Sequence, residues 1–427
     1  MIRRSFIGLT KPLIEYEALD PTLSKPKEIP PPKKITLFLN KSYDPKDSLL
    51  FSIGDKVKTG QKLSYSEDSD AYVISTVTGT IASIASALGD YGKSYTAITI
   101  DTDKNEETDD QFKKLVKDPT LDSAKNFLAG LPGIPPFNLF FDAEKSIHTI
   151  IVCGVDRDLL ITTNQYTLKT DLHAIQNGIH ILKKITKIDN VIIVVPDNLM
   201  QDAATIGGEV RIVNSEYPAT LPHLMIQSFS GQTVPAGKSF EDIGVCFFTA
   251  EAVASIGKAF DNGSIPTTKT LTFIDKNEKK TLISARIGTP VSEILHVFDV
   301  TLNEKDRIIF GGPMTGSSVL SEDYPVLPDT DAIIVQDKDK VDLVSDYPCI
   351  NCGDCIRACP ATVPVNMLVR FLEAGLYEEA ADQYDLYSCI ECGLCSYVCV
   401  SKIPVFHYIK LAKYELDRIR TAEATNA

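Results

Sequence analysis

Short apolar runs alternate with segments of helical spacing between residues 110 and 262. The runs at 147–154 and 191–196 are rich in isoleucine and valine, which is typical of strands covered on both faces. Between them, the apolar residues of segment 169–185 recur at helical spacing. This alternation predicts an α/β domain with a mostly parallel sheet over residues 110–262.

Residues 35–105 have a different pattern, with apolar positions that alternate from Ile35 to Leu39 and two strand–glycine–strand segments at 53–63 and 75–81. Together they resemble the barrel-sandwich hybrid of lipoyl and biotinyl carrier domains. Carrier domains present a modifiable lysine on the hairpin between their halves, and segment 66–71 has none. We therefore expect an unmodified scaffold.

Residues 263–340 predict a third unit. A hairpin pattern at 268–285 precedes a helix that begins near Pro290, and a strand at 306–310 then enters a glycine-rich turn at 311–316. A hairpin followed by a helix is the start of a β-grasp unit.

The first 34 residues are rich in proline, which favours an extended arm. Two interpretations are open. The arm is either a solvated tail or a strap that lies on a partner or on a later domain.

Length and charge narrow the function. A chain of 427 residues is too long for one domain with a single hydrophobic core. Its net charge of −14 argues against a nucleic-acid partner. No run of eighteen apolar residues exists, and the N-terminus lacks a secretory apolar segment. We expect a cytoplasmic protein without a transmembrane segment.

Cysteine placement points to metal. Eight of the ten cysteines lie between residues 349 and 399, whereas a disulfide-rich protein would distribute them. They form two copies of a four-cysteine motif with spacings of two, two and three residues, and Pro360 follows the first copy. Zinc is the competing metal, but four cysteines within eleven residues exceed what a zinc knuckle needs. The motif therefore predicts two [4Fe–4S] clusters.

In two-cluster ferredoxins, the fourth cysteine of each motif reaches the other cluster. We therefore assign Cys349, Cys352, Cys355 and Cys399 to the first cluster. Cys389, Cys392, Cys395 and Cys359 are assigned to the second. The segment between the motifs has a helical pattern, so residues 341–427 resemble an α-helical ferredoxin domain.

The order of these modules resembles the RnfC family of the Rnf electron-transport complex, with further matches at 54–61, 286–290 and 311–316. Cobalamin reductase and the A subunit of sodium-pumping NADH–quinone reductase are related families. The resemblance implies an α/β domain of the complex I flavoprotein-subunit type and an SLBB-like β-grasp unit.

The same resemblance implies a flavin site that is degenerate here. The family binds FMN on a Gly-Gly-Ala-Gly-Phe-Pro loop, and this chain has Gly130 and Gly133 among prolines at 129–137. The family's Glu-Cys-Glu-Pro segment is represented by residues 154–159, with Asp156 and Asp158, and its Tyr-Pro-x-Gly-Gly-Glu segment by residues 217–222. We therefore expect neither retained FMN nor intrinsic NADH oxidation.

The sequence thus predicts a redox subunit of a membrane-associated, Rnf-type ion-translocating oxidoreductase complex, peripheral on the cytoplasmic face of the membrane. Its partners would be membrane and redox subunits, with a soluble electron-carrier protein as a further candidate. Two alternatives stay open: an NADH- or FMN-dependent reductase with an altered site, and a structural iron–sulfur adaptor. Whether the chain is itself an enzyme is left open.

Overall fold

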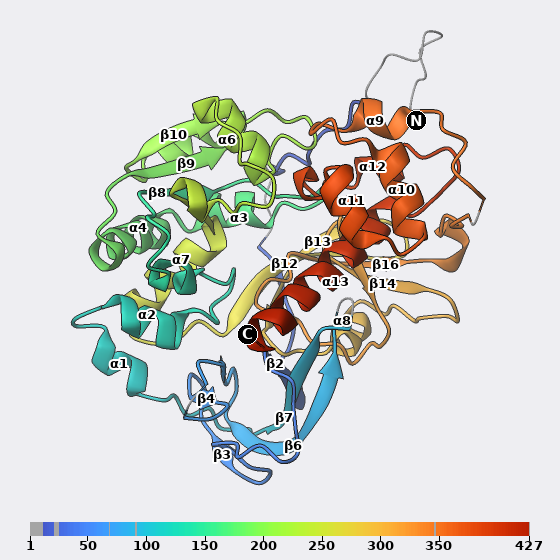
Figure 1. Cartoon of the computed structure of the whole chain (residues 1–427). Helices are drawn as coiled ribbons and strands as arrows, with labels where there is room; N and C mark the ends of the chain where they lie inside the picture. Colours follow the sequence, from blue (N-terminus) through green and yellow to red (C-terminus); the bar gives the residue numbers. More distant parts are fainter. Residues whose placement is uncertain (1–11, 21–24, 68, 90–91, 346, 427) are drawn as a thin grey trace.

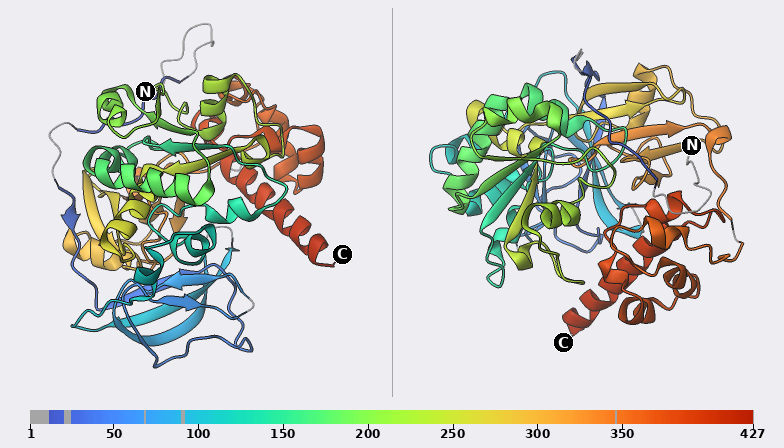
Figure 2. Two further views of the ribbon diagram at one scale, coloured as in Figure 1. Left: turned by 90° about the vertical axis from the view of Figure 1, so that its left-hand side faces the viewer. Right: turned by 90° about the horizontal axis from the view of Figure 1, so that it is seen from above.

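The computed structural model describes residues 12–20, 25–67, 69–89, 92–345 and 347–426. Figure 1 shows four folded parts in contact: a small β-domain (blue), an α/β domain (green), a second β-rich domain (yellow to orange) and a helical domain (red). The α/β and helical domains lie side by side in Figures 1 and 2, and the small β-domain lies at the opposite end.

The small β-domain contains a four-stranded sheet in the order β2-β7-β6-β3 and a hairpin of β4 and β5. Its strands are β2 (Lys34–Leu39), β3 (Lys56–Val57), β4 (Lys62–Ser64), β5 (Tyr72–Ile74), β6 (Gly79–Leu88) and β7 (Ser94–Thr102). The alternation from Ile35 to Leu39 puts the apolar side chains of β2 into one core with Tyr65. Gly54 and Gly60 have positive φ at the turns, as the pattern predicts.

The α/β domain has a four-stranded sheet in the order β10-β9-β8-β11, with every pair parallel. Its strands are β8 (Thr149–Cys153), β9 (Val191–Val195), β10 (Glu209–Ile212) and β11 (Val245–Thr249). Its helices are α1 (Gln111–Leu115), α2 (Leu121–Leu128), α3 (Thr163–Thr170), α4 (Leu172–Thr186), α5 (Met200–Ala204), α6 (Pro222–Ser230) and α7 (Ala250–Asn262). The predicted parallel sheet is thus present.

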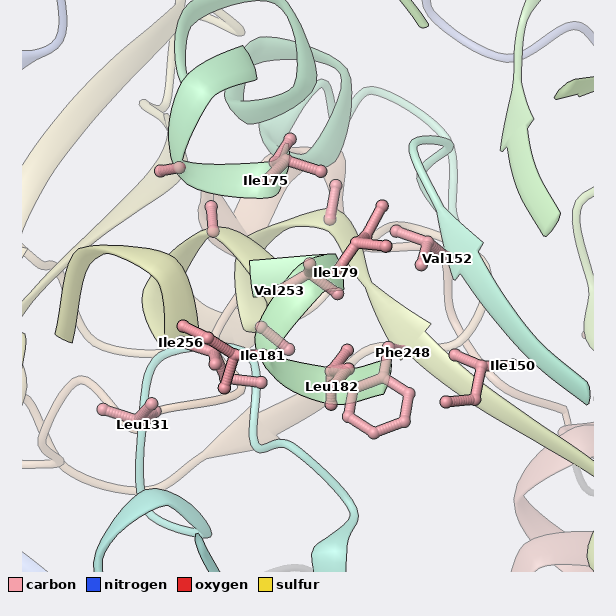
Figure 3. Packing of buried hydrophobic residues seen from close by; sticks show 14 of the residues in the cluster. Leu131, Ile150, Val152, Ile175, Ile179, Ile181, Leu182, Phe248, Val253 and Ile256 are labelled. Atoms are coloured by element: carbon pink, nitrogen blue, oxygen red, sulfur yellow. The ribbon is translucent and has the colours of Figure 1, made fainter. Parts of the chain in front are cut away.

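Both faces of this sheet are covered, which explains its continuous apolar runs. Ile150 and Val152 of β8 pack with α4 and α7, as Figure 3 shows, whereas Ile151 and Cys153 face Met225 of α6. Sheet order changes direction between β8 and β11, because β9 and β10 extend one side of β8 and β11 the other. A crevice at the carboxyl ends of two such strands is where open α/β sheets bind ligands.

The second β-rich domain has the order β1-β13-β12-β16-β14-β15. Its elements are β12 (Thr268–Ile274), β13 (Lys280–Arg286), α8 (Val291–Val297), β14 (Arg307–Phe310), β15 (Ser317–Val319) and β16 (Ala332–Gln336), joined by β1 (Lys27–Glu28) from the arm. The hairpin β12–β13 is antiparallel, and the last strand β16 returns parallel to β12 in the centre. This is the β-grasp arrangement that the sequence predicts.

The helical domain contains α9 (Asp354–Ala358), α10 (Val365–Glu373), α11 (Tyr377–Gln383), α12 (Leu394–Tyr397) and α13 (Val405–Asn426). Leu368 and Leu372 of α10 pack with Ile409 and Leu416 of α13 in a core of its own. Helices, not a hairpin, thus join the two cysteine motifs. Within the part of the chain that the structure describes, every helix is too short or too polar to span a bilayer.

The described part of the arm lies on later domains. Tyr16 N donates to Ser215 O and Tyr217 N to Ile14 O, both at 2.8 Å, and β1 pairs with β13. Glu17 forms an ion pair with Lys280 of the β-grasp domain. Of the two interpretations of the arm, these contacts favour the strap; residues 1–11 and 21–24 lie outside the described residues.

Candidate metal centre

The two cysteine motifs have the same backbone conformation. In each copy, the second residue after the first cysteine has positive φ (Asn351, Glu391), as does the glycine after the second cysteine (Gly353, Gly393). A short helix, α9 or α12, begins directly after that glycine and carries the third cysteine. The repeated spacing thus folds as a repeated loop that presents three thiols from one tight turn.

The structure brings the eight cysteines together in two groups. Each group lines a separate small pocket whose remaining walls are mostly apolar. The members of the first group are Cys349, Cys352, Cys355 and Cys399. The members of the second group are Cys389, Cys392, Cys395 and Cys359. In both groups, the fourth thiol comes from the other motif.

The two pockets are close neighbours. Val365, the first residue of α10, lines both of them, and α9 packs against α12. A redox group in one pocket would therefore lie about one side chain from a redox group in the other.

The donor chemistry fits iron–sulfur clusters. Each pocket offers four thiols, the ligand set of a [4Fe–4S] cluster. Among the described residues, no set of three or more His, Cys, Asp or Glu side chains could hold a single metal ion. Burial raises the pKa of the Cys355 thiol to about 11 and that of Cys392 to about 12, and the neighbouring cysteines add to the shift. Bound iron would supply the positive charge that makes buried thiolates favourable.

The second group has a more enclosed environment than the first. Cys392 and Cys395 are 7% and 9% exposed, whereas Cys352 is exposed. Glu391 N donates to Cys389 Sγ at 3.4 Å, an amide contact of the kind that tunes cluster potential. Lys413 of α13 donates to Cys389 O and to Glu391, both at 2.8 Å.

Residues from other domains complete this environment. The Tyr217 hydroxyl donates to Cys392 O at 2.6 Å, and Met314 packs in one apolar cluster with Cys392 and Leu394. Neither residue is assigned to the site by sequence reasoning. Segments 217–222 and 311–316, which contain them, stand out in the sequence only as matches to a family pattern.

Three family models match the chain. They describe the RnfC barrel-sandwich hybrid domain over residues 21–105, the Nuo51 FMN-binding domain over 136–258 and a 4Fe-4S dicluster domain over 342–400. The C subunit of the ion-translocating oxidoreductase complex of Buchnera aphidicola is 28% identical over 376 residues, covering 84% of this chain and 79% of the relative. This chain is a relative of the RnfC proteins.

Two further relatives and one solved structure are also similar to the chain. The C subunit of the proton-translocating ferredoxin:NAD+ oxidoreductase complex of Clostridium ljungdahlii is 27% identical over 394 residues, covering 86% of this chain and 84% of the relative. The Klebsiella pneumoniae relative is longer, and the chain covers 55% of it. An air-oxidized NAD+-reducing [NiFe]-hydrogenase structure matches with a TM-score of 0.42 and 13% identity, over 63% of this chain and 56% of the hydrogenase chain.

Because an FMN-binding family model matches residues 136–258, the residues at the carboxyl ends of the parallel strands are candidates for a flavin site. The crevice at the carboxyl ends of β8 and β11 is filled by polar side chains. Asn164 of α3 donates to Asp156, and its Oδ1 accepts from Glu251 N at the start of α7. Lys269 of β12, fully buried, pairs with Glu251. Side chains of the α/β and β-grasp domains thus occupy the crevice between β8 and β11. A cavity of about 530 Å³ at the carboxyl ends of β8, β9 and β10, lined by Asp156 and Asp197, lies beside it.

The two glycines of the degenerate flavin loop, Gly130 and Gly133, do not form a phosphate-binding loop together. Gly133, with φ of +82°, lies against the start of α7, where a Cβ would come within 2.6 Å of Ala252 N. That amide already donates to Thr249 Oγ1, the N-cap of α7. Gly130 lines a cavity of about 430 Å³ where the small β-domain, the α/β domain and the β-grasp domain meet, and no cysteine of either group lines it.

The two candidate carboxylates are also engaged. Asp156 accepts from Asn164 N at 2.8 Å and from Gln165 Nε2 at 3.1 Å, so it satisfies the start of α3 itself. Asp158 accepts from Leu159 N and from the loop at 311–316. Both carboxylates thus already accept hydrogen bonds from the protein, and Asp156 occupies the start of α3, where a phosphate would otherwise bind. This engagement does not favour a dinucleotide at the β8–β11 crevice.

Proposed function

We propose that this chain relays electrons through two [4Fe–4S] clusters as the RnfC component of a membrane-associated, Rnf-type ion-translocating oxidoreductase complex. The observation that carries the proposal is the pair of four-thiol pockets that share Val365. When bound, each cluster would accept and release one electron at a time.

The chain's own residues would perform three tasks. The thiolates of Cys349, Cys352, Cys355 and Cys399 would hold the first cluster, and those of Cys389, Cys392, Cys395 and Cys359 the second. Val365 would separate the two clusters by a single side chain. This short separation matters because the rate of electron transfer falls steeply with distance. The surrounding apolar side chains, such as Phe406 and Ile409 at the second pocket, would exclude water from the thiolates.

The partners follow from the relatives. The Buchnera and Clostridium relatives are named as subunits of ion-translocating complexes. Among the described residues of this chain, no helix is both long enough and apolar enough to cross a membrane. We therefore place it peripherally, on the cytoplasmic face, beside membrane and redox subunits. Because its flavin crevice is filled, electrons would enter from another protein, either a neighbouring subunit or a soluble carrier.

The test is anaerobic purification followed by metal and sulfide analysis. Two clusters require about eight iron and eight sulfide per chain. Dithionite should produce EPR signals of reduced clusters, and Cys246→Ala, which removes a buried thiol outside both groups, should leave the content unchanged. Stoichiometric zinc with no EPR signal would overturn the proposal. Clusters that no redox partner reduces would favour the structural-adaptor alternative.

A further inference from the structure

Asp158 joins the α/β domain to the glycine-rich loop at residues 311–316 of the β-grasp domain. Its carboxylate is 3% exposed and accepts four hydrogen bonds. Oδ1 accepts from Leu159 N at 2.7 Å and Met314 N at 3.1 Å, and Oδ2 accepts from Thr315 N at 2.8 Å and Thr315 Oγ1 at 2.6 Å. Three of these four donors belong to the loop, so the carboxylate fixes the loop's backbone.

The fixed loop lies directly against the second cysteine loop. A Cβ on Gly393, which stands between Cys392 and Cys395, would overlap the carbonyl oxygen of Met314. A Cβ on Gly312 would likewise overlap the Asp158 carboxylate. Glycine at both positions therefore lets carboxylate, loop and cysteine turn stack in direct contact.

The contact covers only one of the two pockets. Met314 shares an apolar cluster with Cys392 and Leu394, and Cys392 is buried. Cys352, the equivalent thiol of the first motif, is exposed. The stack thus contributes to the difference in enclosure between the two cysteine groups, together with Tyr217 and its apolar neighbours.

We propose that Asp158 is a positioning residue for the second iron–sulfur cluster, which it shields from water by holding Met314 over the Cys392–Gly393 turn. The inference rests on the proposed function, since it requires a cluster on Cys389, Cys392, Cys395 and Cys359. Its role is indirect: the carboxylate acts through the loop and touches no thiol.

The physical effect is on reduction. An added electron makes a cluster more negative, and water stabilises that charge better than apolar side chains do. Release of the loop would admit water to the second pocket and make its cluster easier to reduce. The first cluster lies outside the stack and would keep its potential.

The experiment is an EPR-monitored redox titration of the purified holoprotein. Asp158→Ala should shift the midpoint potential of the second cluster to a more positive value and leave that of the first unchanged. Thr315→Val is the milder variant, because it removes only the hydroxyl bond to Asp158, and it should give a smaller shift in the same direction. If Asp158→Ala does not fold, Thr315→Val decides the question.

Asp306→Ala is the matched control, and it should leave the midpoint potentials of both clusters unchanged. Asp306 also accepts from two backbone amides of the β-grasp domain, Asn303 N and Lys338 N, and pairs with Lys276, but it belongs to neither pocket. Unchanged potentials in loaded, folded Asp158→Ala and Thr315→Val, or equal shifts of both clusters, would overturn the inference. Absence of clusters from the wild-type protein would instead refute the proposed function.

Discussion

The hydroxyl of Tyr217 donates a 2.6 Å hydrogen bond to the carbonyl oxygen of Cys392, across 175 residues of sequence. Tyr217 lies before α6 in the α/β domain, and Cys392 lies in the second cysteine loop. A buried polar contact of this kind fixes the orientation of one domain on another, because an unpaired carbonyl would be costly. This bond therefore helps to hold the α/β domain against the domain that carries the two cysteine motifs.

The first prediction concerns this hydrogen bond. Tyr217→Phe removes the donor and leaves the buried Cys392 carbonyl unpaired, at a cost of about 1–3 kcal/mol. We expect the second cluster to be lost faster on anaerobic heating, which is measured from the bleaching of its visible absorption. Tyr397→Phe, at a 46% exposed tyrosine on α12, is the control and should behave as wild type. Equal rates of cluster loss in both variants would show that the bond does not support the cluster.

The second prediction concerns the exchange of the fourth cysteines. Because Cys359 lines the second pocket and Cys399 the first, Cys359→Ser should alter the EPR signal of the second cluster. Cys399→Ser should alter that of the first. The crossed assignment is wrong if each serine perturbs the cluster of its own motif.

Much of the fold could be predicted from short-range patterns. The apolar runs around Ile150 and Ile193 predicted buried parallel strands because period and composition report burial directly. The doubled cysteine spacing likewise implied two clusters, because ligand spacing reflects the local geometry of a loop.

The surroundings of the site could not be predicted in the same way. The bonds from Asp158 to Thr315 and from Tyr217 to Cys392 join residues more than 150 positions apart. Nothing in the spacing of a lone aspartate or tyrosine indicates such a partner. The resemblance drew attention to Asp156 and Asp158 as counterparts of the family's acidic segment, and only the structure reveals that other donors already occupy both carboxylates.

The third prediction concerns pH. Burial raises the pKa of Asp156 to about 6, and nearby Asp331 adds to the shift. The folded protein therefore binds the Asp156 proton more tightly than the unfolded chain does. As a result, the contribution of Asp156 to the free energy of unfolding falls as pH rises from about 4 to about 6, and it is constant above about pH 6. Two pKa units correspond to about 3 kcal/mol.

Asp156→Asn removes this titration. Between pH 4.5 and pH 7, values that bracket the pKa of about 6, the wild type should therefore lose stability relative to Asp156→Asn. Urea unfolding at the two pH values measures it. A difference that does not depend on pH would show that Asp156 is not the titrating group.

The fourth prediction concerns the network that fills the crevice. Lys269→Met removes the partner of Glu251 and leaves a buried carboxylate uncompensated, which should destabilise the protein by about 3–5 kcal/mol. Lys280→Met, which breaks the partly exposed pair with Glu17, should cost about 1 kcal/mol or less. Thermal unfolding of the two variants checks the contrast, and similar losses would contradict it.

The last prediction is that the isolated chain carries little FMN and does not oxidise NADH. A dinucleotide site needs backbone amides that approach a pyrophosphate and a carboxylate for a ribose hydroxyl. Here Pro132, Pro135 and Pro136 supply no amide, and the amide of Ala252 at the start of α7 already has Thr249 as its acceptor. Asp156 and Asp158 are likewise engaged.

The measurement combines flavin analysis with stopped-flow reduction of the clusters. We expect dithionite to reduce the clusters, and NADH to leave them oxidised even after incubation with excess FMN. Dithionite serves as the control, because it reports that the clusters are present and reducible in the same preparation. Stoichiometric FMN with rapid NADH-driven reduction would restore the reductase alternative, since electrons would then enter through the α/β domain and not through a docked protein.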